Sequence, residues 1–264
     1  MQMQKSKSLA FVVGCFLLLS SGLSANHELS PADTDKRILA ITYYHYPPKL
    51  LVINGQPSGI YVDQLEDVAK RAGYKINWIF SDIDEEAKML DDGRRAFCTT
   101  GRMPTKERAE RWAFLPYLFD VAHKDTILTR ADMVEKFANY NSIADVALDT
   151  AFKGTLLRSG IYGDIIDQLL ESKPSWINLS GATDLQMMKM VLAGRADWTI
   201  VPHEQWLEAQ KLDREVSQLA ELKDFGALSD YPIYIACSKA LNQDVLNSLA
   251  IAMEAAGFER GEMP

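Results

Sequence analysis

Short apolar runs alternate with amphipathic stretches along most of this chain, and this alternation constrains the fold more than any other feature. Residues 38–43 and 75–80 have the length and composition of buried strands. Between them, apolar residues recur at helical spacing over 62–72, and Gly73 follows as a helix stop. Repeated strand–helix–strand units of this kind predict an α/β fold with parallel strands.

The alternation occurs in two successive sets. The first set also contains an expected helix at 85–90, a strand at 96–100 and a helix that starts at Thr105. The second set contains expected strands at 155–158, 176–178 and 198–201 and helices at 162–170 and 183–193, before a strand at 233–237 and a helix at 244–256. Each set is too small to bury all the apolar residues, so we expect two lobes.

The first 25 residues have the pattern of a secretory signal peptide. Lys5 and Lys7 precede an apolar run at 9–19, and small residues lead to a cleavage site after Ala25. The run is shorter than the roughly 20 apolar residues of a membrane span. A lipoprotein cleavage before Cys15 is the less favoured alternative, because it would divide the apolar run. We therefore expect a periplasmic protein.

The charge of the chain limits the classes of binding partner, and its cysteine content limits the kinds of site. The chain carries 28 Lys and Arg against 36 Asp and Glu, a formal charge of −8 that becomes −10 when Lys5 and Lys7 are removed with the signal peptide. This acidic balance disfavours nucleic acid and anionic membranes as partners. The two cysteines that remain, Cys98 and Cys237, are either a disulfide or two buried thiols. No motif predicts a metal site, and we expect no cofactor.

Three loops that follow expected strands have the composition of a ligand site. Ligands of α/β sheets bind at the carboxyl ends of the strands, where helix N-termini supply N–H groups. The loops are rich in tyrosine, arginine and glycine, which suits a small and partly anionic ligand. Their candidate residues are Tyr43, Tyr44, Gly101, Arg102, Arg158, Ser159 and Tyr162. For any single tyrosine, packing in the core is an equally good explanation.

Arg108 is placed unusually within its expected helix. Thr105 is a suitable N-cap, and Glu107 complements the positive end of the helix dipole. Arg108 opposes that dipole, which costs the helix about 0.3 kcal/mol when the side chain is exposed. Either it is a tolerated surface charge, next to an ordinary Glu107–Arg111 pair, or it meets an anionic ligand.

These features together resemble the family-3 extracellular solute-binding proteins, from about Ile38 to the end of the chain. The segments that carry the resemblance are NGQPSGIYVD at 54–63, MPTKER at 103–108, Pro116-Tyr117 and GRAD at 194–197. Within the family, a segment at 159–163 and the two cysteines resemble a poorly characterised proteobacterial group, many of whose members have no obvious transporter.

The resemblance implies a two-lobed periplasmic-binding-protein fold of type II, in which each lobe is a mixed sheet flanked by helices. Crossings near Val121 and Ser229 would divide the chain into lobe one, 26–121 plus 230–264, and lobe two, 122–229. In that topology the strands of Cys98 and Cys237 are neighbours, which favours a disulfide between them.

The resemblance also assigns candidate ligand residues. Arg108 would bind a ligand carboxylate with help from the backbone near Gly101 and Arg102. The remaining contacts would come from Tyr43, Tyr44 and Tyr61 in lobe one and from Arg158, Ser159, Tyr162 and Glu204 in lobe two.

Two positions depart from the family pattern. Met103 stands where relatives carry a hydroxyl, and no carboxylate stands at Val201-Pro202, where relatives hold the ligand's ammonium. Glu204 could take that role, or the ligand lacks an ammonium group. The sequence does not identify the ligand.

The function that follows is capture of a small polar ligand by closure of two lobes in the periplasm. We expect this ligand to carry a carboxylate, with or without an ammonium group. We expect a monomeric binding protein rather than an enzyme, in amino-acid transport with an ABC permease. One alternative is a dehydratase-like enzyme with His203 or Glu204 as general acid. The other is an accessory protein that senses a ligand and reports it to a membrane partner.

Overall fold

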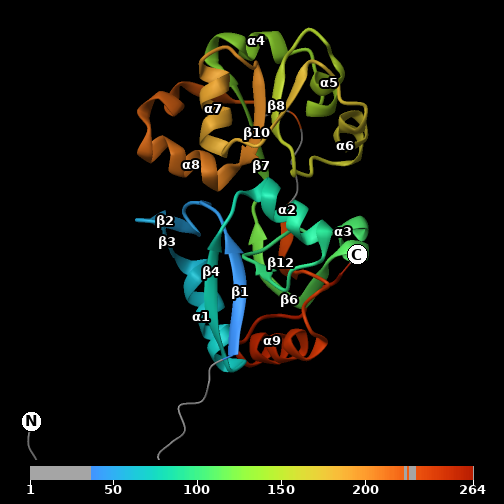
Figure 1. Ribbon diagram of the computed structural model, residues 1–264. Helices are drawn as coiled ribbons and strands as arrows, with labels where there is room; N and C mark the ends of the chain where they lie inside the picture. Colours follow the sequence, from blue (N-terminus) through green and yellow to red (C-terminus); the bar gives the residue numbers. More distant parts are fainter. Residues whose placement is uncertain (1–36, 223–224, 226–229, 264) are drawn as a thin grey trace, which may run out of the picture. The chain divides into compact units, whose positions relative to one another are not determined.

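The computed structural model describes residues 37–222, 225 and 230–263, and these residues form two five-stranded sheets (Figure 1). The expected signal peptide, residues 1–25, lies outside the described residues, and so does the expected crossing at Ser229. Among the described residues, no helix combines the length and apolar character needed to cross a membrane. Below, lobe one and lobe two are the parts of the structure built around the first and the second sheet.

The first sheet has the strand order β4-β1-β5-β12-β6. Its strands are β1 (Arg37–Tyr43), β4 (Tyr74–Phe80), β5 (Cys98–Thr99), β6 (Ala113–Ala122) and β12 (Tyr231–Cys237). β1 runs parallel to β4 and β5, whereas β12 runs antiparallel to β5 and β6. A hairpin of β2 (Leu51–Ile53) and β3 (Gln56–Ser58) precedes the first helix.

Helices cover lobe one because their apolar stripes complete its core. Leu65 and Val68 of α1 (Ile60–Arg71) join Leu249 and Met253 of α9 (Gln243–Ala255) in one buried cluster with β1. Leu90 of α2 (Ile83–Asp92) belongs to a second, smaller cluster. The short α3 (Lys106–Arg111) follows, with the Thr105 hydroxyl as its N-cap.

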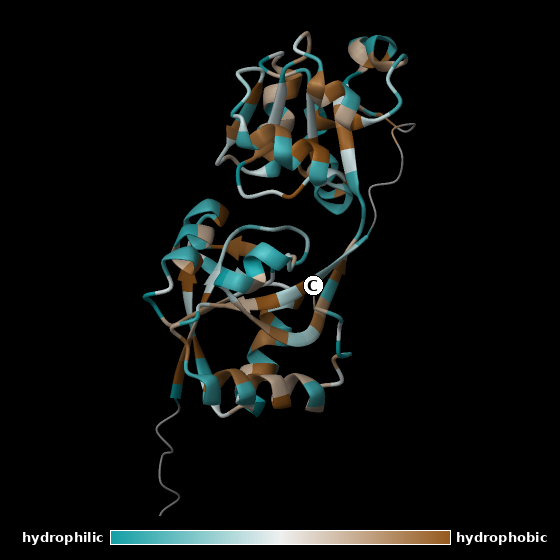
Figure 2. Ribbon diagram, turned by 90° about the vertical axis from the view of Figure 1, so that its right-hand side faces the viewer, coloured by the Kyte–Doolittle hydropathy of each residue, from teal (hydrophilic) through white to brown (hydrophobic). Residues whose placement is uncertain are grey.

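The second sheet has the order β11-β7-β10-β8-β9. Its strands are β7 (Asp125–Arg130), β8 (Gly154–Leu157), β9 (Ile177–Ser180), β10 (Trp198–Pro202) and β11 (Leu219–Glu221). β8 runs parallel to β9 and β10, and β7 runs antiparallel to β10 and β11. Figure 2 shows apolar residues concentrated in the strands of both sheets.

Two groups of helices complete lobe two, each with its own buried cluster. The first cluster includes residues of α4 (Val134–Phe137), α5 (Ile143–Leu148) and α6 (Asp164–Glu171). The second includes residues of α7 (Asp184–Leu192) and α8 (His203–Leu212), while 3-10 turns at Ala131–Met133 and Arg214–Gln218 link helices to strands. The chain leaves lobe one after Ala122 and enters lobe two at Asp125. Two mixed sheets, each flanked by helices, confirm the expected α/β, two-lobed fold class.

Several elements differ from the sequence expectation for local reasons. β6 was not expected, and it contains Pro116, which has no N–H to donate to a neighbouring strand. β6 is the last strand in the order of its sheet, where the missing N–H of proline is tolerated, and the Pro116 carbonyl accepts from Gly261 N at 3.1 Å. The helix expected from residue 162 begins instead at Asp164, after Gly163 with φ +93°. β7 and α8 were also not expected.

Cys98 and Cys237 form a disulfide. They are register partners on the antiparallel strands β5 and β12, and both side chains are fully buried. The bond closes a sequence separation of 139 residues. The alternative of two free thiols is therefore excluded.

Candidate functional site

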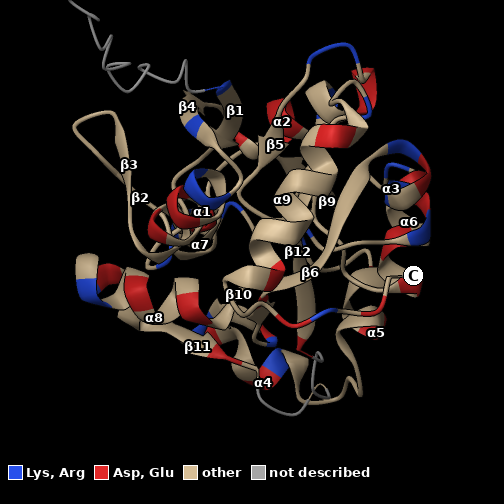
Figure 3. Cartoon of the chain, turned by 90° about the horizontal axis from the view of Figure 1, so that it is seen from below, with Lys and Arg blue, Asp and Glu red and all other residues tan. Residues whose placement is uncertain are grey.

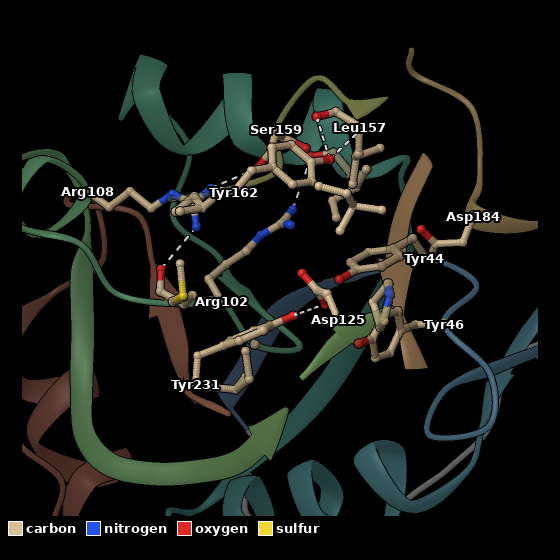
Figure 4. Close-up of a pocket in the computed structure, with 18 of the residues that line it drawn as sticks. Tyr44, Tyr46, Arg102, Arg108, Asp125, Leu157, Ser159, Tyr162, Asp184 and Tyr231 are labelled. Atoms are coloured by element: carbon tan, nitrogen blue, oxygen red, sulfur yellow. Dashed lines mark hydrogen bonds between the residues drawn. The ribbon is translucent and has the colours of Figure 1, made fainter. Parts of the chain in front are cut away.

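A cavity of about 130 Å³ is lined by loops of both lobes (Figure 4). Because ~10–15 Å³ is enough to admit one water molecule, this volume has room for several waters or for a small organic ligand. Lobe one contributes Tyr44, Gly101, Arg102 and Arg108, among others; lobe two contributes Asp125, Ser159, Tyr162 and Asp184. The cavity is thus of the right size for a ligand as small as an amino acid.

The lining loops follow the carboxyl ends of parallel strands, as the sequence led us to expect. Tyr44 follows β1, Arg102 follows β5, and Ser159 follows β8. The residue at position 101, between β5 and Arg102, must be glycine because its φ is +133° and a Cβ there would lie 2.6 Å from Cγ2 of Ile233. The backbone at this position therefore approaches β12 more closely than any other residue type allows.

Arg108 is a half-buried cation without an anionic partner. Its Nη1 donates to the Met103 carbonyl at 3.0 Å and its Nη2 to the Ser159 carbonyl at 2.9 Å, and the guanidinium lies 5.1 Å from the centroid of the Trp112 ring. Within the described chain, no carboxylate oxygen lies within 4.0 Å of it. Burial, with further repulsion from Arg102, lowers the pKa of Arg108 to about 10. Its charge is uncompensated.

Arg102, by contrast, is neutralised. Its Nη2 donates to Glu86 at 2.5 Å and to the Ile83 carbonyl at 3.1 Å, and Glu86 is fully buried. Burial raises the pKa of Glu86, although the charge of Arg102 opposes that shift. The guanidinium lies 5.4 Å from the centroid of the Tyr44 ring, and its buried Nε has no hydrogen-bond partner among the described residues. Arg102 is therefore fixed in place, and its Nε–H is left without an acceptor in the described chain.

Two carboxylates of lobe two line the same cavity without a cation beside them. Asp125 accepts a long hydrogen bond from the Tyr231 hydroxyl at 3.4 Å, and burial raises its pKa to about 6. Asp184 is the first residue of α7, and burial followed by the charge of Asp125 raises its pKa to about 7. Neither forms an ion pair with a described Lys, Arg or His. Figure 4 shows Arg108 and Asp184 at opposite sides of the cavity, with Asp125 between them.

Seven of the ten predicted ligand residues line the cavity: Tyr44, Tyr61, Gly101, Arg102, Arg108, Ser159 and Tyr162. The Tyr61 hydroxyl is already committed, because it donates to Asp120 at 2.5 Å. The Tyr162 hydroxyl bonds both the N–H and the carbonyl of Leu157, at 2.7 and 3.1 Å, and so fixes its own loop. The Ser159 hydroxyl is buried and has no partner among the described residues.

Tyr43 lies in the core instead of the cavity. It is 3% exposed, meets Trp78 and Phe80 edge-on, and donates its hydroxyl to the Gly55 carbonyl at 2.9 Å. Because successive side chains of a strand point to opposite faces, Tyr43 and the next residue, Tyr44, have different environments. Packing, the alternative that the sequence left open, is its role.

Arg158 and Glu204 do not line the cavity but join the two lobes. Arg158 pairs with Asp84 of α2 at 3.1 Å. Glu204, in the first turn of α8, pairs with Lys49 of lobe one at 3.1 Å. Their charges are committed to these bridges.

Sequence reasoning missed Asp125, Asp184 and Tyr231, which all line the cavity, as does Tyr46 of the loop that follows β1. Asp125 begins a strand that was not expected, and Asp184 reads as an ordinary acidic residue in the first turn of a helix. The pairing of β7 with β10 places Asp125 opposite Pro202. An acid therefore stands beside Pro202, where the resemblance led us to expect one, but it comes from the neighbouring strand.

The charged groups of the described chain do not form a metal site. No group of three or more His, Cys, Asp or Glu side chains in this part of the chain could hold an ion. On the face shown in Figure 3, acidic and basic residues lie side by side on α1, α3 and α8. The cavity brings unpaired charges of both signs together, Arg108 on one side and Asp125 and Asp184 on the other.

Solved structures show the same fold at low identity. The chain is similar to ArtJ, an arginine-, lysine-, histidine-binding protein from Geobacillus stearothermophilus, with 17% identity and a TM-score of 0.64 over 84% of this chain and 91% of that one. A histidine kinase sensor domain with similarity to periplasmic binding proteins has 18% identity and a TM-score of 0.63, over 86% of this chain and 98% of the other. AncCDT-1, an ancestral amino acid-binding protein and precursor of cyclohexadienyl dehydratase, has 20% identity and a TM-score of 0.58, over 83% and 90% of the two chains.

Comparison of sequences adds the family. No curated protein matches this chain. A model of the bacterial extracellular solute-binding proteins, family 3, matches residues 38–221, which include both sheets apart from β12 and the first residue of β1. The chain therefore belongs to the bacterial extracellular solute-binding proteins of family 3.

Proposed function

We propose that this protein binds a free α-amino acid as a zwitterion, with the carboxylate on Arg108 and the ammonium between Asp125 and Asp184. The observation that carries the proposal is the arrangement of unpaired charges in one cavity: a cation on one side and two carboxylates on the other. An unpaired charge that is shielded from water costs free energy. A zwitterion would compensate both signs at once, whereas a dicarboxylate would leave Asp125 and Asp184 unpaired.

Neutral groups of the cavity complete the site in this proposal. Arg102 and Ser159 line the carboxylate side of the cavity, where the Nε of Arg102 and the hydroxyl of Ser159 have no partner among the described residues. Tyr44, Tyr61, Gly101 and Tyr162 form walls around the ligand. The absence of a hydroxyl at Met103 is then offset by Ser159, which comes from the other lobe.

Closure of the lobes is the proposed mechanism. Arg108 of lobe one donates to the Ser159 carbonyl of lobe two, and the Arg158–Asp84 and Lys49–Glu204 pairs also cross between the lobes. A ligand that touches both lobes only when they are together shifts the population to the closed state by its differential affinity. The proposed lobes are 26–121 plus 230–264 and 122–229, and Arg158 and Glu204 act as closure contacts.

The proposed setting is the periplasm, reached through cleavage of the signal peptide at 1–25, where a monomer would deliver its ligand to an ABC permease. The binding of arginine, lysine and histidine by ArtJ supports an amino acid as the ligand class. Because ArtJ is named as a binding protein, we prefer a binding role to an enzymatic one for this chain.

One observation favours a second candidate, a dehydratase. The pKa of Asp184, raised to about 7, lets this carboxyl hold a proton at neutral pH, as a general acid must. AncCDT-1 is named as the precursor of such an enzyme. His203 and Glu204, the acids expected from the sequence, do not line the cavity, so Asp184 would take that role.

The test is replacement of Arg108 by methionine, with Arg111→Met as the matched control. Arg111 lies on the same helix and pairs with Glu107 and Asp91 at the surface. The twenty standard L-amino acids are first screened by thermal shift, and those that stabilise the protein are titrated by calorimetry. We expect Arg108→Met to weaken binding by about 100-fold or more, since a buried charge pair is lost, and Arg111→Met to keep wild-type affinity. Unchanged affinity in Arg108→Met would refute the site, and turnover of a cyclic hydroxy acid, lost in Asp184→Asn, would favour the dehydratase.

A further inference from the structure

A second cavity of about 190 Å³ adjoins the first. The two share five lining residues, Tyr44, Tyr46, Ile83, Leu157 and Asp184. Figure 4 shows Tyr44, Tyr46 and Asp184 together at one side of the first cavity. We call this second space the side chamber. A ligand held at Asp184 therefore lies at the boundary between the two spaces.

The wall of the side chamber is mainly apolar. Its apolar residues include Phe80, Ala182, Leu185, Met188, Ala209 and Leu212. Its titratable side chains, apart from those of the shared tyrosines, are His45, Asp82 and Asp184. Asp82 caps α2 by accepting from Glu85 N at 2.7 Å, and Nδ1 of His45 accepts from Val52 N at 3.1 Å. Asp184 is thus the charged group of this wall that remains free for a ligand.

Large apolar side chains are exposed where the side chamber reaches the surface. Phe80, the last residue of β4, is 63% exposed, and Leu212, the last residue of α8, is 66% exposed. These side chains come from different lobes, and Gln205 of α8 donates across the same space to the Pro47 carbonyl of lobe one. A molecule in the side chamber would therefore touch both lobes and favour their closure, as a ligand of this protein must.

We propose that the side chamber binds the apolar side chain of the ligand, so that this protein takes amino acids with a long aliphatic or aromatic side chain in preference to small or charged ones. The inference rests on the proposed function, because the shared Asp184 anchors the ammonium at the entrance. The volume of about 190 Å³ exceeds that of the first cavity. A ligand side chain attached next to the ammonium therefore has room to extend past Tyr44 into the side chamber. A cationic group at the end of such a side chain would find no free carboxylate in the wall beyond Asp184.

The experiment is a calorimetric titration at pH 8 with straight-chain L-2-amino acids, from alanine to 2-aminooctanoic acid. Each methylene moved from water into an apolar wall is expected to raise the affinity about fourfold, until the chamber is full. Lysine, which is as long but ends in a cation, should bind more weakly than norleucine by at least tenfold. A dependence of this kind would support the side chamber as the subsite for the side chain.

Two exposed leucines on α8 provide a matched pair of variants. Leu212 lines the side chamber, whereas Leu207, 46% exposed on the same helix, lines neither cavity. Leu212→Gln should reduce the gain in affinity for the longer ligands, and Leu207→Gln should leave the whole series unchanged. Ala182→Phe, which adds volume within the chamber wall, should flatten the dependence on chain length.

The outcomes separate this inference from the proposed function. If alanine and its longer homologues bind with equal affinity, or if Ala182→Phe keeps the full gain, the side chamber is not the subsite, while the zwitterion site stands. If no member of the series binds, the proposed function fails and this inference fails with it. If lysine binds as tightly as norleucine, the apolar preference is overturned.

Discussion

Replacing Asp184 by asparagine should stabilise the unliganded protein at neutral pH while it weakens ligand binding. Burial and the charge of Asp125 raise the pKa of Asp184 to about 7, from an ordinary value of 3.8. Between pH 4 and pH 7 the folded state therefore binds more protons than the unfolded state, and its stability falls as the pH rises. Asparagine carries no such charge, so the variant escapes this loss.

The magnitude follows from the shift. At 1.36 kcal/mol for each pKa unit, the full shift corresponds to about 4 kcal/mol at pH 8. The carboxyl is only half-buried, and with solvent screening we expect about half of this, ~2 kcal/mol. Asp184 also lies in the first turn of α7, where the helix dipole favours a carboxylate by ~0.3–1 kcal/mol. Desolvation is the larger effect, so the net change is a gain in stability.

The free energy of unfolding is measured by urea titration of the unliganded protein at pH 5 and pH 8. We expect the gain in Asp184→Asn to grow from below about 1 kcal/mol at pH 5 to ~2 kcal/mol at pH 8. Asp244→Asn is the control, because Asp244 is an exposed acid in the first turn of α9 and reports the helix-dipole contribution alone. A variant that is less stable than wild type at pH 8, or a gain that is the same at both pH values, would refute the argument that Asp184 is a desolvated carboxylate.

Two further predictions concern the disulfide and the pH dependence of binding. Cys98→Ser with Cys237→Ser should lower the free energy of unfolding by about 5 kcal/mol, because the disulfide closes 139 residues; a shift in the urea midpoint equivalent to less than about 1 kcal/mol would contradict the loop-entropy argument. Affinity for an amino acid should rise with pH through about 6 to 7, where Asp125 and Asp184 ionise, and level off near pH 8, since an ammonium group needs carboxylates. Calorimetry from pH 5 to pH 8 tests this, and an affinity that increases on acidification would exclude these two residues as the ammonium site.

Much of the local structure could be predicted, because it depends on neighbours in the chain. The apolar pattern at 38–43 and 75–80 predicted β1 and β4 to within one residue. The apolar stripe at 62–72 predicted α1, since a helix that covers a sheet must repeat its apolar residues every three or four positions. The cap at Thr105 followed from the chemistry of a short hydroxyl side chain before a helix.

Elements whose stability depends on distant partners were missed. β6 contains Pro116, and the strand is tolerated because it lies at the end of its sheet order and its Leu118 N–H donates to the Glu259 carbonyl. No pattern within residues 113–122 reports that remote segment. Tyr43 and Tyr44 could not be distinguished for the same reason. Both are tyrosines, at and just after the end of β1, but Tyr43 faces the core and Tyr44 faces the cavity.

Local patterns in the chain are sufficient to predict the α/β class, the position of Arg108 after a capping threonine, and the two cysteines that follow the expected signal peptide. Two pairings depend on the fold of the whole chain: β12 returns beside β5 and joins Cys237 to Cys98, and β7 pairs with β10 and places Asp125 opposite Pro202. Periodicity and capping depend on residues that are neighbours in the chain, whereas the pairing of strands depends on which packing of remote segments buries the most apolar surface. The charges that define the cavity therefore meet only in the folded protein.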